Sequence, residues 1–98
     1  MNRYDRKIIR TQNAGVFLAN VEEFNPETRV AVLTNSRRLW YWDGAASLSQ
    51  LAMEGTTAPA NCKFPTEVSS MIVCEVIEMI DTTPAARASI DGVPVWKW

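Results

Sequence analysis

The chain has 98 residues, a formal net charge of −1 and an apolar fraction of 47%. This length predicts a single domain, residues 1–98, and the apolar fraction favours a folded core over disorder. The near-neutral charge argues against non-specific adhesion to nucleic acid or membrane as the main function.

The charge is divided unevenly along the chain. Residues 1–38 carry seven Lys and Arg against four acidic residues, whereas the remainder carries three against seven. This division is compatible with charge complementarity inside the fold, with one positive face for an anion, or with head-to-tail pairing of copies.

The first ten residues and the length of the apolar stretches bear on where the protein is located. The first ten residues are charged and lack the apolar segment of a signal peptide, and no stretch reaches the ~20 apolar residues that span a bilayer. We therefore expect a soluble, cytoplasmic protein with no membrane partner.

Cys62 and Cys74 lack metal-binding spacing, and zinc needs about four ligands, so we expect no metal and no cofactor. Whether the two thiols pair stays open.

The first half of the chain predicts strands separated by turns. Turn-forming residues occupy Asn13-Ala14-Gly15 and Asn25-Pro26-Glu27-Thr28. Strands about ten residues apart with short turns predict a small, strongly bent antiparallel sheet or an SH3-like partial barrel. The expected strands are Lys7–Thr11, Val16–Glu22, Arg29–Thr34 and Arg37–Trp42.

The apolar period then changes to that of a helix. Ser47 and Gln50 have the spacing of a capping box, and a stripe of apolar residues follows, so a helix is expected over Ser47–Glu54. Pro84–Ile90 predicts a second short helix, because Pro is favoured at the first helical position. The fold class is therefore α+β, with one or two short helices.

Two further segments have extended character. Val68–Ile80 is β-prone, and the parity of its apolar positions changes near Glu78, which predicts a bulge or a sharp bend. The tail, Val93–Trp98, is compatible with a final strand or with an arm that docks on a neighbouring subunit.

One segment, Asn35–Gly44, places two arginines beside three large aromatic residues. Arg binds phosphate or carboxylate through two parallel hydrogen bonds, and Trp or Tyr stacks on a base or sugar. The alternative is that the aromatic rings pack in the core and the arginines cover them. The candidate ligand-binding residues are Arg37, Arg38, Trp40 and Trp42, with Arg10, Asn13 and Phe64 as secondary contributors.

The sequence gives little indication of a catalytic site. It contains no histidine, so a Ser or Cys nucleophile lacks its usual base. Glu22 and Glu23 are adjacent on a predicted strand and therefore point to opposite faces. We expect a binding protein and not an enzyme.

Three segments carry a resemblance to a known group of proteins. The chain resembles a family of short proteins encoded by bacteriophages and prophages, mostly of unknown function, and the resemblance spans nearly the whole chain. That family often has Ala at the position of Ser36. The segments are Asn13–Val16, the motif NSRRLWYWDGAASLSQLA at residues 35–52, and CKFP at residues 62–65.

In size and style the chain is also similar to phage anti-defence sponge proteins. These proteins oligomerise and sequester nucleotide immune signals, such as the cyclic ADP-ribose isomers made by Thoeris defence. The resemblance implies a homo-oligomer in the host bacterial cytoplasm that sequesters a small anionic nucleotide. Two alternatives stay open: a protein–protein inhibitor of a host or defence enzyme such as a CRISPR effector, and a small nucleic-acid-binding module, which the net charge disfavours.

Overall fold

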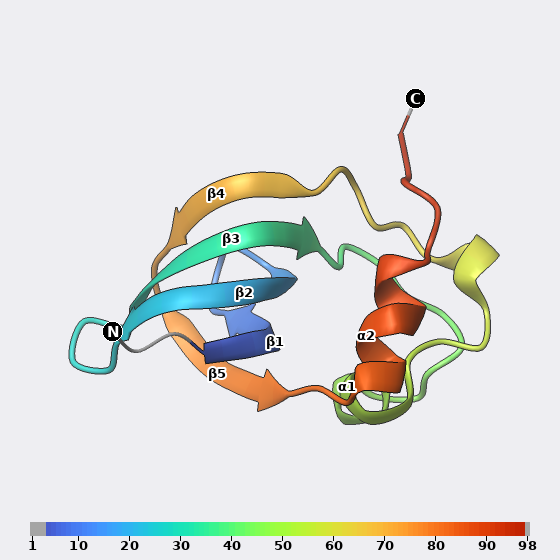
Figure 1. The fold of residues 1–98 in the computed structure, drawn as a ribbon, viewed down its shortest axis with the longest axis horizontal. Coiled ribbons are helices and arrows are strands. Elements are labelled where there is room, and N and C mark those ends of the chain that lie inside the picture. Colours follow the sequence, from blue (N-terminus) through green and yellow to red (C-terminus); the bar gives the residue numbers. More distant parts are fainter. Residues whose placement is uncertain (1–3, 98) are drawn as a thin grey trace.

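In the computed structural model, which describes residues 4–97, five antiparallel strands form one sheet in the order β4-β3-β2-β1-β5. Two helices lie together at one end of the sheet (Figure 1). This confirms the predicted α+β class. The elements are β1 (Tyr4–Thr11), β2 (Val16–Asn25), β3 (Val30–Arg38), α1 (Leu48–Glu54), a 3-10 turn (Pro59–Asn61), β4 (Val68–Val73), β5 (Val76–Asp81) and α2 (Pro84–Asp91).

The sheet is strongly bent, as the sequence predicts, but it does not close into a barrel. β4 and β5 lie at opposite edges, yet only Cys74 and Glu75 connect them. Three peptide units span at most about 11 Å between the Cα atoms of Val73 and Val76. The two edges must therefore approach each other at this end, although among the described residues each edge strand pairs only with its inner neighbour.

The break between β4 and β5 lies earlier than the parity change near Glu78 that predicted a bend. Glu75 adopts a left-handed backbone conformation with φ of +58°. Its carbonyl accepts a hydrogen bond from the Gln12 amide at 3.1 Å, and the Val76 amide donates to the Arg29 carbonyl at 3.0 Å. These contacts turn the chain from one edge strand to the other.

The expected strands Arg29–Thr34 and Arg37–Trp42 are one strand, β3, which ends at Arg38. Asn35 has φ of +49°, and the register with β2 shifts beside it, so the strand continues through a bulge. The prediction of a separate fourth strand was wrong, because residues 40–42 leave the sheet. There Tyr41 forms one isolated bridge to Lys63.

Apolar side chains form a cluster on each face of the sheet. The helix-side cluster joins strand residues to both helices and to the loop after α1, whereas the second cluster lies on the other face. Members of the helix-side cluster include Ile8, Leu18, Leu39, Leu51, Ala52, Cys62, Phe64, Ile90 and Val93. The second cluster includes Ile9, Phe17, Ala19, Val21, Ala31, Leu33, Val73 and Val76.

Capping residues next to each helix define where it begins. The Ser47 side chain accepts from the Gln50 amide at 3.1 Å, and the Gln50 side chain accepts from the Ala46 amide at 2.7 Å. Thr83 caps α2, with Pro84 at the first helical position. Both predicted helices are confirmed. None of the helices in residues 4–97 is long and apolar enough to cross a membrane.

The tail and the cysteines complete the fold. Val95 makes a single parallel bridge to Phe64, so no final strand forms within residues 93–97, and Trp98 lies outside the described residues. Cys62 is buried, Cys74 is exposed, and both thiols are free.

Candidate functional site

The two adjacent arginines of the motif lie on opposite faces of the sheet. In the register of β2 and β3, Arg37 is opposite Leu18 and Arg38 is opposite Phe17. Leu18 belongs to the helix-side cluster and Phe17 to the second cluster. Because neighbouring strand residues alternate in direction, Arg37 lies on the face that the helices cover, and Arg38 lies on the face of the second cluster.

Arg37 is buried, with 4% of its surface exposed, and its guanidinium is saturated by backbone carbonyls. Its Nη2 donates to the Val93 carbonyl at 2.6 Å, and its Nη1 donates to the Ile90 carbonyl at 2.9 Å. Longer bonds reach the carbonyls of Phe64, Pro65 and Asp91. Arg37 therefore ties the tail and the end of α2 to β3, which corrects its expected role as a phosphate-binding residue.

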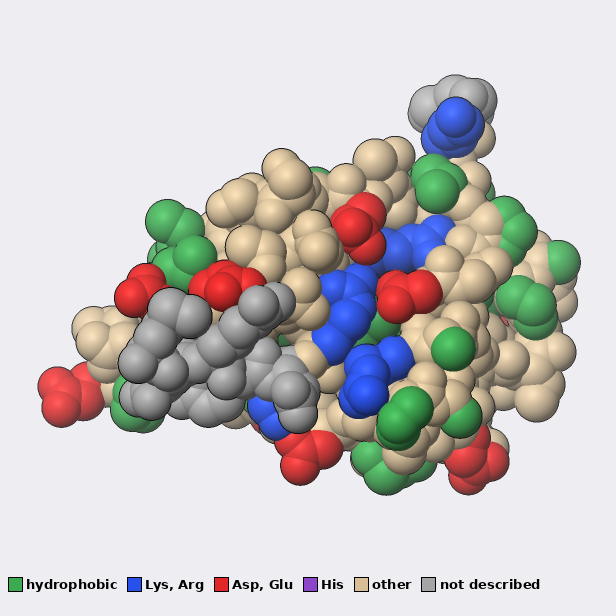
Figure 2. Space-filling view, viewed as in Figure 1, with side chains coloured by type: hydrophobic (Ala, Val, Ile, Leu, Met, Phe, Trp, Pro, Cys, Tyr) green, Lys and Arg blue, Asp and Glu red, His purple; other side chains and the backbone are tan. Residues whose placement is uncertain are grey.

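The surroundings of Arg37 are nearly balanced in charge. Burial lowers the pKa of Arg37, while the carboxylates of Asp91 and Glu67 act in the opposite direction. The neighbouring Arg6 donates to Glu67 at 3.3 Å and to Asp91 at 3.1 Å. Figure 2 shows basic side chains flanked by acidic ones in the middle of this face. A hollow of about 280 Å³ there presents two carboxylates, which disfavours an anionic ligand.

Arg38 is exposed, and its guanidinium carbon lies 4.8 Å from the centroid of the Phe17 ring. Among the described residues, its side chain has no hydrogen bond or ion pair, so its N–H donors face solvent. Arg38 contributes to the wall of a cavity of about 440 Å³ beside the second cluster. The other lining residues are Phe17, Ser36, Pro65, Thr66, Val68, Met71, Trp96 and Lys97.

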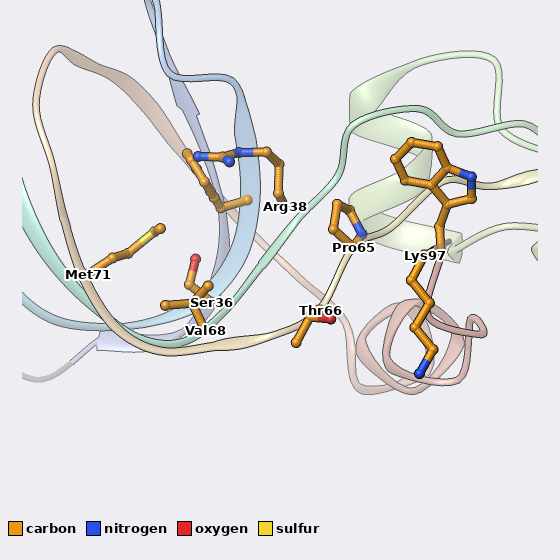
Figure 3. Close-up of a pocket in the computed structure, with 9 residues that line it drawn as sticks. Ser36, Arg38, Pro65, Thr66, Val68, Met71 and Lys97 are labelled. Carbon is orange, nitrogen blue, oxygen red and sulfur yellow. The ribbon is translucent and has the colours of Figure 1, made fainter.

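Ser36 gives this cavity an unusual polar group. The residue is 1% exposed, and its buried Oγ has no hydrogen-bond partner among the described residues. An unpaired buried hydroxyl costs about 1–3 kcal/mol. In Figure 3 the hydroxyl points toward the Arg38 side of the cavity, while Lys97 extends away from it. The cavity therefore combines apolar walls with one unused hydroxyl and one unused guanidinium.

A group of exposed aromatic rings adjoins the cavity. Trp40 and Trp96 stack with centroids 5.1 Å apart and planes inclined by 14°. The Lys63 ammonium lies 5.4–5.8 Å from the rings of Trp40, Tyr41 and Trp96. We call these four residues the aromatic patch. Trp96 belongs both to the patch and to the cavity wall, so the two features are continuous.

The remaining predicted residues do not join this site. Trp42 packs partly buried against the helix-side cluster, and Phe64 is completely buried under Arg37. Arg10 donates to Glu78 at 2.7 Å, and Asn13 donates to both carboxylate oxygens of Glu75. Arg10 is adjacent to Ile9, so it points away from the sheet face on which Phe17 and Arg38 lie.

Of the residues predicted from the sequence, Arg38 lies in the cavity wall and Trp40 lies in the adjoining aromatic patch, whereas most of the wall was not predicted. Pro65, Thr66, Val68 and Met71 come from β4 and the segment before it, and Trp96 and Lys97 come from the tail. Nothing in their local pattern indicates that β4 lies beside β3. Within the described part of the chain, no three His, Cys, Asp or Glu side chains come together as a metal site would require.

Comparison with known proteins places the chain in a family. A family model, the domain of unknown function DUF6948, matches residues 5–90. The chain belongs to this family. The match contains the β3, β4 and loop residues of the cavity and ends before Trp96 and Lys97. No curated protein and no solved structure matches the chain.

Proposed function

We propose that this DUF6948 protein binds a small, planar, anionic ligand of the nucleotide class in the cavity at Arg38, without converting it. The observation that supports the proposal is a cavity of about 440 Å³ in which an unpartnered hydroxyl and an unpaired guanidinium accompany apolar walls. This volume is within the range of about 300–1,000 Å³ typical of small-molecule sites.

Each lining group has a chemical role in this proposal. Arg38 offers two parallel N–H donors to a phosphate, and its stacking on Phe17 holds the guanidinium plane in place. The exposed edge of the Trp96 ring offers a stacking surface for a base, and Trp40 supports that ring from its other side. Ser36 lines the wall near Arg38, and in this proposal its Oγ, which is buried in this structure, bonds a polar atom of the ligand once the ligand displaces a neighbouring side chain.

The proposed biological role is sequestration of a nucleotide immune signal, as the similarity to phage sponge proteins implies. In this role the protein acts in the host cytoplasm as a homo-oligomer and removes a cyclic nucleotide or an ADP-ribose derivative from solution. Because the phage proteins that the sequence resembles often have Ala at position 36, we assign the Ser36 hydroxyl to ligand choice and Arg38 to affinity.

The test is calorimetry of the purified protein against cyclic nucleotides and ADP-ribose derivatives. Arg38→Met should weaken binding roughly 10- to 150-fold, because a charge-assisted hydrogen bond contributes about 1.5–3 kcal/mol. Arg10→Met is the matched control, because the Arg10 side chain is 42% exposed but lies on the other face. The proposal is abandoned if no compound binds at micromolar concentration, or if the two variants bind alike.

The variant Ser36→Ala tests whether the unpaired Ser36 hydroxyl serves ligand binding or the stability of the fold. Removal of the unpaired hydroxyl should leave the free energy of unfolding unchanged or raise it by up to about 1 kcal/mol. The same variant should change the order of affinities across the ligand panel. A loss of stability would indicate that the hydroxyl has a structural partner and not a ligand role.

The aromatic patch supports a second candidate, an inhibitor that binds a host or defence enzyme. Trp40 is 59% exposed, and stacked Trp rings beside a cation are typical anchors of protein interfaces. Pull-down from bacterial lysate distinguishes the two functions. A stoichiometric protein partner that is lost with Trp40→Ala supports the inhibitor, whereas a nucleotide released on heating supports the ligand-binding protein.

A further inference from the structure

The charged groups on the wall of the cavity at Arg38 are few and all basic. They belong to Arg38 and Lys97, and no carboxylate is among the described lining residues. Glu67 stands between two lining residues in the sequence, but its side chain bonds Arg6 at 3.3 Å and borders the hollow at Arg37 instead. An anion in the cavity is therefore attracted by Arg38 and is not repelled by an acidic residue of this wall.

The two basic residues differ in how firmly their charged groups are held. The Arg38 guanidinium lies 4.8 Å from the centroid of the Phe17 ring, a contact that restrains its position. Lys97 is exposed, and in Figure 3 its side chain extends away from the cavity. A lysine ammonium is strongly hydrated and its stem is flexible, so bringing it over a ligand costs hydration and side-chain entropy. Arg38 is therefore the one restrained cation of the described wall.

We propose that the ligand presents to Arg38 a phosphodiester with a single negative charge, as a cyclic nucleotide does. A phosphodiester has two non-bridging oxygens, and the two parallel N–H donors of one guanidinium bind both of them. One negative charge then meets one positive charge, and both charged oxygens have a donor. This inference rests on the proposed function and narrows its ligand class, because it excludes nucleoside monophosphates and ADP-ribose as the preferred ligands.

A ligand with more phosphate charge does not match the rest of the wall. A phosphate monoester has a third terminal oxygen and a charge of about −1.5 to −2 near pH 7. The wall residues around Arg38 are mostly apolar and include Phe17, Pro65, Val68 and Met71. An unpaired charge against apolar side chains is costly. Ser36 and Thr66 can donate hydrogen bonds, but a hydroxyl does not neutralise a second charge.

The composition of the chain makes the charge of the ligand measurable. The sequence contains no histidine, which is the side chain that ordinarily changes its charge between about pH 5 and 8. Arginine and lysine side chains ordinarily keep their charge throughout this range. A phosphate monoester, in contrast, gains its second charge with a pKa of about 6. A change in affinity across this range therefore reports the ionisation of the ligand and not that of the cavity wall.

The ligand class is tested by calorimetry of cyclic mononucleotides against the matching nucleoside monophosphates and ADP-ribose. Near pH 7 the best cyclic mononucleotide should bind roughly 5- to 150-fold more tightly than its monophosphate, because one charged oxygen of the monophosphate stays unpaired. At about pH 5 the affinity for the monophosphate should rise roughly 3- to 9-fold, since its second charge is neutralised, whereas the affinity for the cyclic mononucleotide should change less than about twofold.

The same phosphodiester chemistry occurs in each half of a cyclic dinucleotide, and stoichiometry distinguishes the two sources. A cyclic mononucleotide should bind as one molecule per protomer. Tighter binding of cyclic di-AMP, at one molecule per two protomers, would also support the proposal and would identify a cyclic dinucleotide as the source of the phosphodiester.

The variant Lys97→Met tests whether a second cation takes part. It should change the affinity for the best cyclic nucleotide less than about twofold, and circular dichroism confirms that the variant is folded. A loss as large as that of Arg38→Met would overturn the assignment of a single charge. Equal or tighter binding of a monophosphate or of ADP-ribose near neutral pH would also overturn it, while the proposed function would stand. If no compound binds, the proposed function itself is wrong.

Discussion

At the residue scale, the strand period gives two neighbouring arginines different functions. Arg37 donates to five carbonyls of the tail and of the segments around it, whereas Arg38 lies free beside the cavity. The sequence predicts that alternate residues of this strand face opposite ways. It does not predict which arginine is buried, because that depends on the bulge at Asn35 and on the arrival of residues 90–93 from the far end of the chain.

This difference gives a direct prediction for stability. Arg37→Met should lower the free energy of unfolding by about 2–4 kcal/mol, because buried carbonyls lose their donor. Arg38→Met should cost less than about 1 kcal/mol, since it loses only one exposed cation–π contact. Urea unfolding followed by Trp fluorescence measures both variants. Equal stability of the two proteins would contradict the assignment of Arg37 as the structural residue.

At the element scale, local signals predicted the helices better than the strands. Ser47, Gln50 and Thr83 act as caps through contacts within four residues, so the sequence alone contains the necessary information. Strand ends depend instead on non-local pairing. Residues 40–42 have strong β propensity but no neighbouring strand to pair with, and they leave the sheet beside the buried Leu39.

The contact between the two helices depends on a glycine at the end of α1. Gly55 has φ of +78°, and a Cβ atom there would lie 2.4 Å from the Cβ of Ser89 in α2. Gly55→Ala should therefore cost more than the roughly 1–3 kcal/mol of a non-glycine residue held at a positive φ. Thermal or urea unfolding measures the cost.

Gly15→Ala is the matched control for this prediction. Gly15 also has positive φ, +101°, but a Cβ atom there would have the Arg38 Nε as its nearest neighbour, at 3.8 Å. This variant should show the backbone cost without the steric one. If both variants lose the same stability, the close approach of α1 and α2 at Gly55 does not contribute to the cost of replacing this glycine.

At the scale of the whole molecule, the candidate site depends on the bend of the sheet. The cavity takes its walls from β2, β3, β4 and the tail, so it exists only after residues far apart in sequence have come together. The sequence predicted a bent sheet from strand spacing. It did not predict that β4 and β5 would separate to opposite edges, because the Val68–Ile80 segment indicates one β-prone element with a bend near Glu78 and carries no local signal that its two halves pair with different strands.

The two-residue connection between those edges provides the last prediction. Insertion of two glycines between Cys74 and Glu75 should lower stability by about 1–3 kcal/mol, because it disrupts the bonds from Gln12 to Glu75 and from Val76 to Arg29. The added loop length itself contributes little. The same insertion between Glu27 and Thr28 disrupts the turn's own bonds from Arg29 and Thr28 to Asn25, but it joins strands that are already neighbours, so it should cost less than the insertion after Cys74. If the two insertions are equally tolerated, the short connection is not what holds the edges of the sheet together.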